Sequence, residues 1–280
     1  MGDLTEKTAT GVVVEELTRG GSPRLKEIIR SLITHLHGFV REVGLTEEEW
    51  MEGIKFLEET GKIIPGEFIL LSDNLGVSVL VDLINHRKPK GATENNLMGP
   101  FYQEGSPERA AGSRVFEDDD ADPLFWSGQV RGPDGTPIKG ALLDIWQTAS
   151  NANYQMVDES QPQHNFRGKY RSGADGRYDF ETVCPDSYPI PTEGSVGKLL
   201  KAIGRPEIRP AHVHFKVSAH GYTPLTTMIF PSGDKYLSQD PVFGVRESLI
   251  IDVAKHEKDE GNRKAPFYTA EFDFVLEPAA

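Results

Sequence analysis

The sequence has almost no cysteine: Cys184 is the single thiol among 280 residues. One cysteine cannot form an intramolecular disulfide, and it excludes a zinc site built from several thiolates. Long apolar runs are missing too, since no stretch approaches the roughly 18 residues that a membrane span needs. The first residues, MGDLTEKT, lack the basic-then-apolar pattern of a signal peptide. We therefore expect a cytoplasmic protein with no membrane span.

Positive charge is also in deficit. Lys and Arg number 30 against 43 Asp and Glu, which gives a net charge of −13. Because phosphate binding depends on clustered cations, nucleic acid is not an expected partner. The apolar share of 38% and the charged share of 26% are typical of a globular chain. At roughly 150 residues per domain, the length corresponds to one large domain or two modest ones.

Residues 1–110 have a helical pattern of apolar side chains. A first stripe follows Ser22, a candidate N-cap, and Pro23, which suits the first helical position. Its members are Leu25, Ile28, Ile29, Leu32, Leu36, Phe39, Val40 and Val43. Thr46 and Glu49 have the spacing of a capping box, which predicts a second helix that Gly61 ends. A third helix is expected within 67–86.

Residues 111–280 change to a β pattern after the acidic stretch 117–120. The segment FWSGQVRGPDGTPIKGALLDIWQTA predicts two strands joined by a Pro-Asp-Gly turn, and Asp175-Gly176 predicts a hairpin before YDFETV. Further strands are expected in AHVHFKVSA, LTTMIF, ESLIIDV and YTAEFDFVL. Short strands without long helices between them favour an antiparallel β-sandwich. The expected fold is therefore α+β, with long functional loops at 147–172 and 184–210.

The segment RPAHVHFKV, residues 209–217, contains the sharpest chemical pattern. Side chains alternate across a strand, so His212 and His214 project from one face and can share a metal ion. The alternative is a pair of surface or structural histidines, which are common. Arg209 lies just upstream of the pair.

Two loop tyrosines, Tyr154 in SNANYQM and Tyr188 in PDSYPIPTEG, are candidate partners for these histidines. A tyrosine is more often a packing residue. A phenol with a pKa of about 10 ionises near neutral pH only beside a strongly Lewis-acidic cation such as Fe(III). A carboxylate ligand to ferrous iron, a zinc hydrolase and a non-catalytic β-sandwich module remain open alternatives at this point.

The combination of NANY, SYPIPTEG, RPAHVHF and LTT followed by SGDKYL resembles the intradiol ring-cleaving dioxygenases over almost the whole chain. The resemblance implies one non-haem Fe(III) per subunit, with Tyr154, Tyr188, His212 and His214 as ligands. It assigns Arg209 to stabilising charge on the substrate ring. It further implies that Tyr188 is the base that takes a substrate proton, and that residues 1–110 form a homodimer interface next to a catalytic domain of residues 111–280.

Within this family the segments 72–102 and 221–250 look most like the hydroxyquinol-cleaving branch. That likeness implies cleavage of hydroxyquinol (benzene-1,2,4-triol) by O2 to maleylacetate (3-hydroxy-cis,cis-muconate). The pocket residues carried over are Leu70, Asp73, Leu97, Met98, Gly99, Pro100, Phe101, Ile190, Pro191, Arg209 and Val242. The alternative substrates are catechol or chlorocatechols, which give cis,cis-muconates. Met228 stands where the catechol-cleaving branch commonly has glutamine.

Three of these pocket residues have plain structural alternatives. Leu70 and Val242 could simply pack in the core. Asp73, in the segment SDN, could be a helix N-cap.

Overall fold

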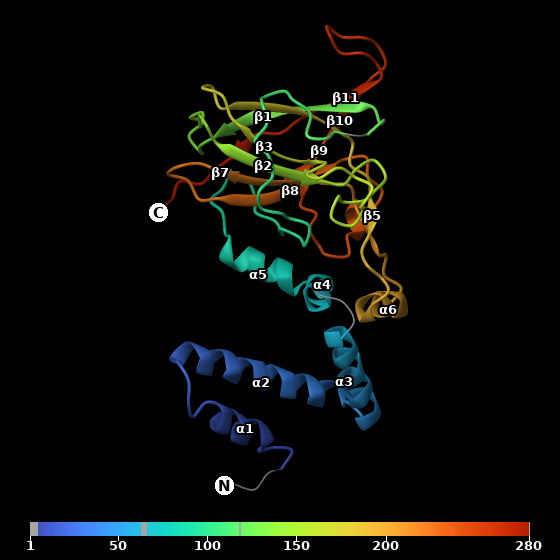
Figure 1. Cartoon of the computed structure of the whole chain (residues 1–280). Coiled ribbons are helices and arrows are strands. Elements are labelled where there is room, and N and C mark those ends of the chain that lie inside the picture. Colours follow the sequence, from blue (N-terminus) through green and yellow to red (C-terminus); the bar gives the residue numbers. More distant parts are fainter. Residues whose placement is uncertain (1–4, 63–65, 118, 280) are drawn as a thin grey trace. The chain divides into compact units, whose positions relative to one another are not determined.

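The computed structural model describes residues 5–62, 66–117 and 119–279, and it divides the chain into two compact units, Met1–Lys62 and Ile63–Ala280 (Figure 1). The first unit is helical, and the second contains the β-strands. No helix among the described residues is both long enough and apolar enough to cross a membrane.

The first unit contains α1 (Ala9–Leu17), α2 (Pro23–Val43) and α3 (Glu47–Lys62). Ser22 caps α2 as predicted, because its hydroxyl accepts a hydrogen bond from the backbone N–H of Leu25 at 3.2 Å. The capping box also forms: Thr46 N–H donates to the Glu49 carboxylate at 2.9 Å, and Glu49 N–H donates to the Thr46 hydroxyl at 3.2 Å. Helix α3 runs one residue past Gly61, and α1 has no counterpart among the predicted helices.

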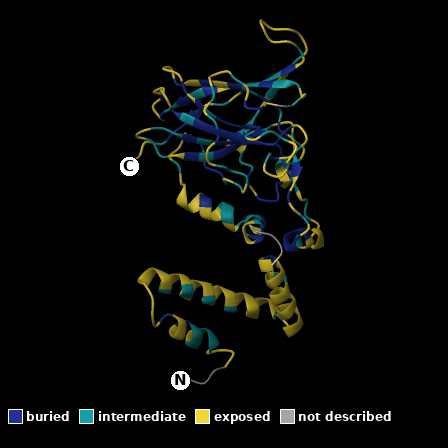
Figure 2. Cartoon of the chain, in the orientation of Figure 1, coloured by how far each residue is buried: buried dark blue, intermediate teal, exposed yellow. Residues whose placement is uncertain are grey.

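Helix α2 has two different long faces. One is tied to α1, where the Thr10 hydroxyl lies 3.1 Å from His37 Nδ1 and accepts a bond from Arg41 at 2.8 Å. Another face carries an exposed apolar stripe, and Figure 2 colours most of α2 as exposed. The stripe consists of Leu25, Ile28, Leu32, Leu36, Phe39 and Val43. Its members recur at helical spacing, so they form one continuous uncovered surface.

The single helix predicted within 67–86 is two helices, α4 (Glu67–Asn74) and α5 (Val77–Asn85). Gly76 separates them with φ of +70°, a left-handed conformation that a right-handed helix cannot continue through. The segment 184–210, expected to be all loop, contains α6 (Ser195–Ala202). The buried Glu67 carboxylate accepts the Val196 N–H at 2.9 Å and so joins α4 to α6.

The strands of the second unit form two five-stranded sheets and one small ribbon. The first sheet contains β10 (Val253–His256), β11 (Phe267–Glu271), β1 (Pro123–Arg131), β12 (Phe274–Val275) and, also paired with β1, β4 (Arg177–Val183). The second has the order β3 (Arg167–Arg171), β2 (Leu142–Gln147), β7 (Val213–Ser218), β8 (Leu225–Pro231) and β9 (Ile250–Ile251). The ribbon pairs β5 (Tyr188–Pro189) with β6 (Ile208–Arg209), and short 3₁₀ turns occupy η1 (Leu237–Gln239) and η2 (Glu247–Leu249).

The two five-stranded sheets pack face to face around one core. Trp126 of the first sheet lies 5.4 Å, centroid to centroid, from Phe215 of the second, and Phe274 lies 4.9 Å from the same ring. These buried rings belong to one apolar cluster that draws side chains from both sheets (Figure 2). The helical N-terminal region and the β-sandwich are therefore confirmed.

Three details of the predicted sandwich are wrong. Strand β1 pairs in parallel with β11 and β12, and β8 pairs in parallel with β9, so the sheets are mixed rather than purely antiparallel. The turn at Pro133–Gly135 does not close a hairpin, because β1 and β2 lie in different sheets. The turn at Asp175-Gly176 likewise joins β3 to β4 across the two layers. Turn signals report a reversal of the chain, and they do not report whether the next strand stays in the same sheet.

Candidate metal centre and active site

The site lies on the side of the second sheet that faces away from the core. In β7, Val213, Phe215 and Val217 belong to the core cluster, so the alternation of the strand turns His214 to the opposite side. There His214 stacks on Trp146 of β2, with ring centroids 4.7 Å apart and planes at 4°. The two residues are paired in register across the strands.

His212 and His214 meet as the spacing predicts. Their Nε2 atoms lie 3.1 Å apart, and both side chains are buried. Nδ1 of His212 donates to the carbonyl oxygen of Pro210 at 2.7 Å, which leaves Nε2 of this ring with a free lone pair. Burial, with help from Arg209, lowers the pKa of His212 to about 3. Burial also lowers the pKa of His214 well below its usual value, so both rings are neutral at pH 7.

The two predicted tyrosines come from different segments and converge on the histidines. Tyr154 lies in the loop between β2 and β3, and its hydroxyl is 3.4 Å from Nε2 of His212. Tyr188 is the first residue of β5, and its ring stands edge-on to that of Tyr154 at 5.4 Å and 89°. Phe101 stacks on Tyr154 with ring centroids 4.3 Å apart. Burial, and then the neighbouring Tyr188, raise the pKa of Tyr154 well above its usual value.

Arg209 joins this group from the end of β6, directly opposite Tyr188 in the β5–β6 ladder. Its Nη1 lies 3.4 Å from the Tyr188 hydroxyl and 3.3 Å from Nε2 of His212. The other side of the guanidinium bonds to the buried Asp240. Burial alone would lower the pKa of Arg209, but the charges of Asp240 and Tyr188 raise it above its usual value, so the side chain stays cationic.

The donor set fits a hard, strongly Lewis-acidic cation. Two neutral imidazole nitrogens and two phenol oxygens face one another, and Nδ1 of His214 is buried without a hydrogen-bond partner in the part of the chain that the structure describes. The described residues contain no cluster of three or more His, Cys, Asp and Glu side chains that could hold a metal ion. The phenol oxygens of Tyr154 and Tyr188 are further candidate donors beside the two histidines, and they favour the ferric hypothesis over the two-His-one-carboxylate and zinc alternatives.

The predicted pocket residues differ in their surroundings. A Cβ at Gly99, where φ is +70°, would stand 3.5 Å from Cε1 of His214, so the chain passes close to that ring. Val242 donates its N–H to Asp240 at 3.3 Å and is buried. Ile190 is buried two residues after Tyr188, whereas Leu97 packs partly against the main core. The pocket roles of these residues, like those of Leu70, Met98, Pro100 and Pro191, stay predictions.

The N-cap alternative for Asp73 is wrong. Asp73 lies in the last turn of α4, and the N-cap position of α5 is Gly76. Burial raises the pKa of Asp73, against the opposing influences of a hydrogen bond from Ser78 and the charge of Arg209. The carboxyl group is thus within electrostatic range of the site.

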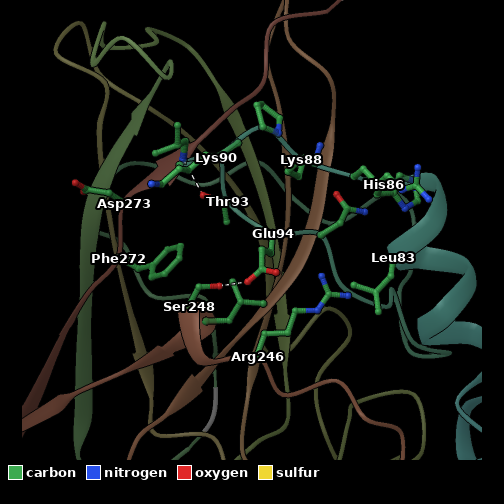
Figure 3. Close-up of a pocket in the computed structure, with 17 residues that line it drawn as sticks. Leu83, His86, Lys88, Lys90, Thr93, Glu94, Arg246, Ser248, Phe272 and Asp273 are labelled. Atoms are coloured by element: carbon green, nitrogen blue, oxygen red, sulfur yellow. Dashed lines mark hydrogen bonds between the residues drawn. The ribbon is translucent and has the colours of Figure 1, made fainter.

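Sequence reasoning missed Trp146, Asp240 and Asp234 as neighbours of the site. Asp240 and Asp234 lie inside the segments that carry the family resemblance, but nothing in their spacing predicts that they are close to the site. A cavity of about 530 Å³ at the end of α5 also had no sequence signal (Figure 3). Glu94 points toward Ser248 there, and none of the predicted ligands lines it.

The comparison with known proteins agrees with this fold. Residues 22–93 match the family model "Catechol dioxygenase N terminus", and residues 97–278 match "Dioxygenase". A 6-chlorohydroxyquinol 1,2-dioxygenase from Cupriavidus pinatubonensis is 43% identical, covering 99% of each chain. A hydroxyquinol 1,2-dioxygenase from a Rhizobium species is 42% identical, covering 98% of this chain and 96% of the relative. The crystal structure of a hydroxyquinol 1,2-dioxygenase from Pseudomonas putida DLL-E4 superposes with a TM-score of 0.94 at 44% identity, covering 98% and 99%.

A helical unit followed by a β-sandwich of mixed sheets is the fold of a class of dioxygenases. The chain belongs to the intradiol ring-cleaving dioxygenases, and the resemblance stated from the sequence is confirmed.

Proposed function

We propose that the chain cleaves hydroxyquinol between its adjacent hydroxyls with O2, giving maleylacetate. The observation that carries this proposal is the meeting of Tyr154, Tyr188, His212 and His214 beside Arg209. The two relatives are named for hydroxyquinol and for its chlorinated form at nearly equal identity, so the triol ring is their common feature. The same three hydroxyls on the ring are what this pocket would recognise.

The four ligands would hold one Fe(III). When bound, the ion supplies a Lewis acid that takes both oxygens of the diol and activates the ring toward O2. The donor set supports this choice, because two phenolates would offset two of the three positive charges. Buried phenols with raised pKa, such as Tyr154, otherwise stay protonated, so the cation is the group that makes them anionic.

Tyr188 is the proposed base. Binding a diol through both oxygens releases two protons, and the phenolate oxygen of Tyr188 would accept one of them. Its hydroxyl already lies 3.4 Å from Nη1 of Arg209, which would stabilise negative charge on the substrate oxygens at the same place. Tyr154, stacked on Phe101 and 3.4 Å from His212, is more firmly enclosed and would remain a ligand.

Asp73 is the proposed acceptor for the third hydroxyl of the triol. Two hydroxyls are used at the metal, so the third must meet the wall of the pocket. A carboxyl group whose pKa is influenced by the charge of Arg209 can accept that hydrogen bond, and catechol would leave it unpaired. Met228 adds a second difference from the catechol-cleaving branch, because its sulfur lies 3.3 Å from Nη2 of Arg209 where a glutamine amide would otherwise stand.

The test is direct. The purified protein is assayed for iron per subunit, for visible tyrosinate-to-Fe(III) absorption, and for O2 consumption with hydroxyquinol, its 6-chloro form, catechol and chlorocatechols. We expect about one iron, a red colour and the highest kcat/KM for a triol. A colourless protein without iron would contradict the metal centre, and a preference for catechol would contradict the substrate alone.

We also propose that the chain is a homodimer. The apolar stripe of α2 supports this, because six large exposed side chains on one helix face are a surface that proteins normally cover. A second copy of the same stripe offers a complementary apolar face.

A further inference from the structure

We infer that Asp234 is a positioning residue that holds the segments of Tyr188 and His212 at a fixed separation; this inference rests on the proposed function. Asp234 lies in the turn after β8, outside the group of four ligands. Its Oδ2 accepts two hydrogen bonds, one from the Ser187 hydroxyl at 2.6 Å and one from the backbone N–H of Ala211 at 2.7 Å.

Each donor immediately precedes a proposed ligand. Ser187 precedes Tyr188 at the start of β5, and Ala211 precedes His212, the residue just before β7. One carboxylate oxygen therefore ties two segments that are 24 residues apart in the sequence. Charge-assisted bonds of this length are among the stronger ones in proteins, so they restrain both segments tightly.

The other oxygen anchors Asp234 itself. Its Oδ1 accepts the N–H of Tyr236 at 2.7 Å, which closes a local turn and fixes the orientation of the carboxylate. All three hydrogen bonds that the carboxylate accepts thus come from neighbouring backbone N–H or hydroxyl groups. Partners that orient metal ligands in this way have large effects on metal sites when they are removed.

The restraint has a specific consequence for Tyr188. A residue that serves first as ligand and then as base needs a backbone that stays in place while its side chain moves. Asp234 supplies this restraint at the preceding residue, while the β5–β6 ladder supplies it at Arg209. Loss of the Ser187 bond should therefore affect Tyr188 more than His212.

The experiment compares Ser187→Ala, Ser187→Thr, Asp234→Asn and wild type, each purified with iron. Ser187→Ala removes only the bond on the Tyr188 side, whereas Ser187→Thr keeps a hydroxyl. Asp234→Asn replaces one carboxylate oxygen with an amide NH2 group, so at least one of the three donors to Asp234 loses its acceptor. The matched controls are Ser232→Ala and Asp252→Asn, which break a similar Ser–Asp bond of 2.7 Å on the exposed surface.

We expect Ser187→Ala and Asp234→Asn to weaken iron retention against a chelator by roughly 10- to 100-fold and to shift the visible absorption band. Ser187→Thr should restore both, and the two controls should match wild type. Ser187→Ala is the informative variant if Asp234→Asn folds poorly, because it leaves the carboxylate in place.

The two proposals fail differently. If wild type is red and cleaves the triol while Ser187→Ala and Asp234→Asn keep its band and iron retention, the role of Asp234 is wrong and the proposed function stands. A loss of thermal stability with an unmoved band would also overturn the positioning role. If wild type itself holds no iron, the proposed function falls and this inference falls with it.

Discussion

Arg209 and Asp240 form a buried ion pair in which Nε and Nη2 of the guanidinium lie 3.2 and 3.3 Å from the two carboxylate oxygens. The side chains are 6% and 2% exposed. Asp240 also accepts the N–H of Gly244 at 2.8 Å. The pair engages one edge of Arg209, so that Nη1 is left for Tyr188 and His212.

We expect Asp240→Asn to destabilise the fold by about 3–5 kcal/mol, because it leaves Arg209 charged and buried without its partner. Burial by itself raises the pKa of Asp240, but the charge of Arg209 and the hydrogen bonds outweigh it and lower the pKa below its usual value. The stabilising contribution is thus complete above the ordinary Asp pKa of about 3.9 and disappears as the pH falls through the lowered value. Urea unfolding of the metal-free protein between pH 7 and pH 3 measures this, and equal stability of mutant and wild type at pH 7 would contradict it.

The histidine pair gives a second prediction. His212→Ala and His214→Ala should each lose most of the iron and the visible colour, since neutral imidazoles supply half of the proposed ligands. Partly buried His256, which lies in β10 outside the site, provides the control as His256→Ala. Metal analysis measures the iron content, and absorbance spectra measure the colour. A double variant that stays red would rule out this ligand assignment.

The two tyrosines should differ in their effects. Tyr188→Phe should still bind iron through three remaining ligands, although less tightly than wild type, and it should bind substrate slowly, because the base is missing. Tyr154→Phe should change the visible band even in the substrate complex, where Tyr154 is expected to stay bound. Rapid mixing with substrate under anaerobic conditions follows both. Equal binding rates in wild type and Tyr188→Phe would contradict the proposed base.

Asp73 should determine the preference for the triol. A hydrogen bond to a charged acceptor contributes about 1.5–3 kcal/mol, so Asp73→Ala should lower the hydroxyquinol-to-catechol ratio of kcat/KM by roughly 10- to 100-fold. Asp73→Asn keeps an acceptor oxygen, so its ratio of kcat/KM should lie between those of wild type and Asp73→Ala. Steady-state rates on both substrates provide the measurement, and an unchanged ratio would remove Asp73 from substrate recognition.

The stripe on α2 should hold the dimer together. Leu32→Asp places a charge in its middle and should convert dimers into monomers, while Thr34→Asp adds the same charge to a polar position of the same helix and should not. Light scattering after gel filtration reports the mass. A monomeric wild type, or a dimeric Leu32→Asp variant, would contradict the proposed interface.

How far the sequence predicts this molecule differs from feature to feature. Local signals worked: the Ser22 cap, the capping box at Thr46 and the same-face pair His212 and His214 all depend on residues within four positions of each other. The break at Gly76 was missed because apolar spacing continues across it, although the backbone does not.

Features that depend on pairing between segments far apart in the sequence cannot be predicted from such local signals. The sheet to which β1 and β2 belong depends on β4, β7, β11 and β12, and no turn motif encodes that choice. Asp234 and Asp240 acquire their neighbours only once β8 and its following loop lie beside β5 and β6. The convergence of Tyr154 and Tyr188 rested on a family resemblance, since nothing local to either loop marks a shared ligand set.

Strand β7 interleaves two sets of residues, with Val213, Phe215 and Val217 in the core and His214 between them on the site face. A deletion or insertion of one residue within this strand would exchange the two sets, sending an imidazole into the apolar interior and a phenyl ring toward the metal. Variation in this strand is thus confined to substitution at constant length. Loops are not subject to this alternation, so changes in chain length that alter substrate choice should accumulate in loops without a proposed ligand, such as the one around Val242.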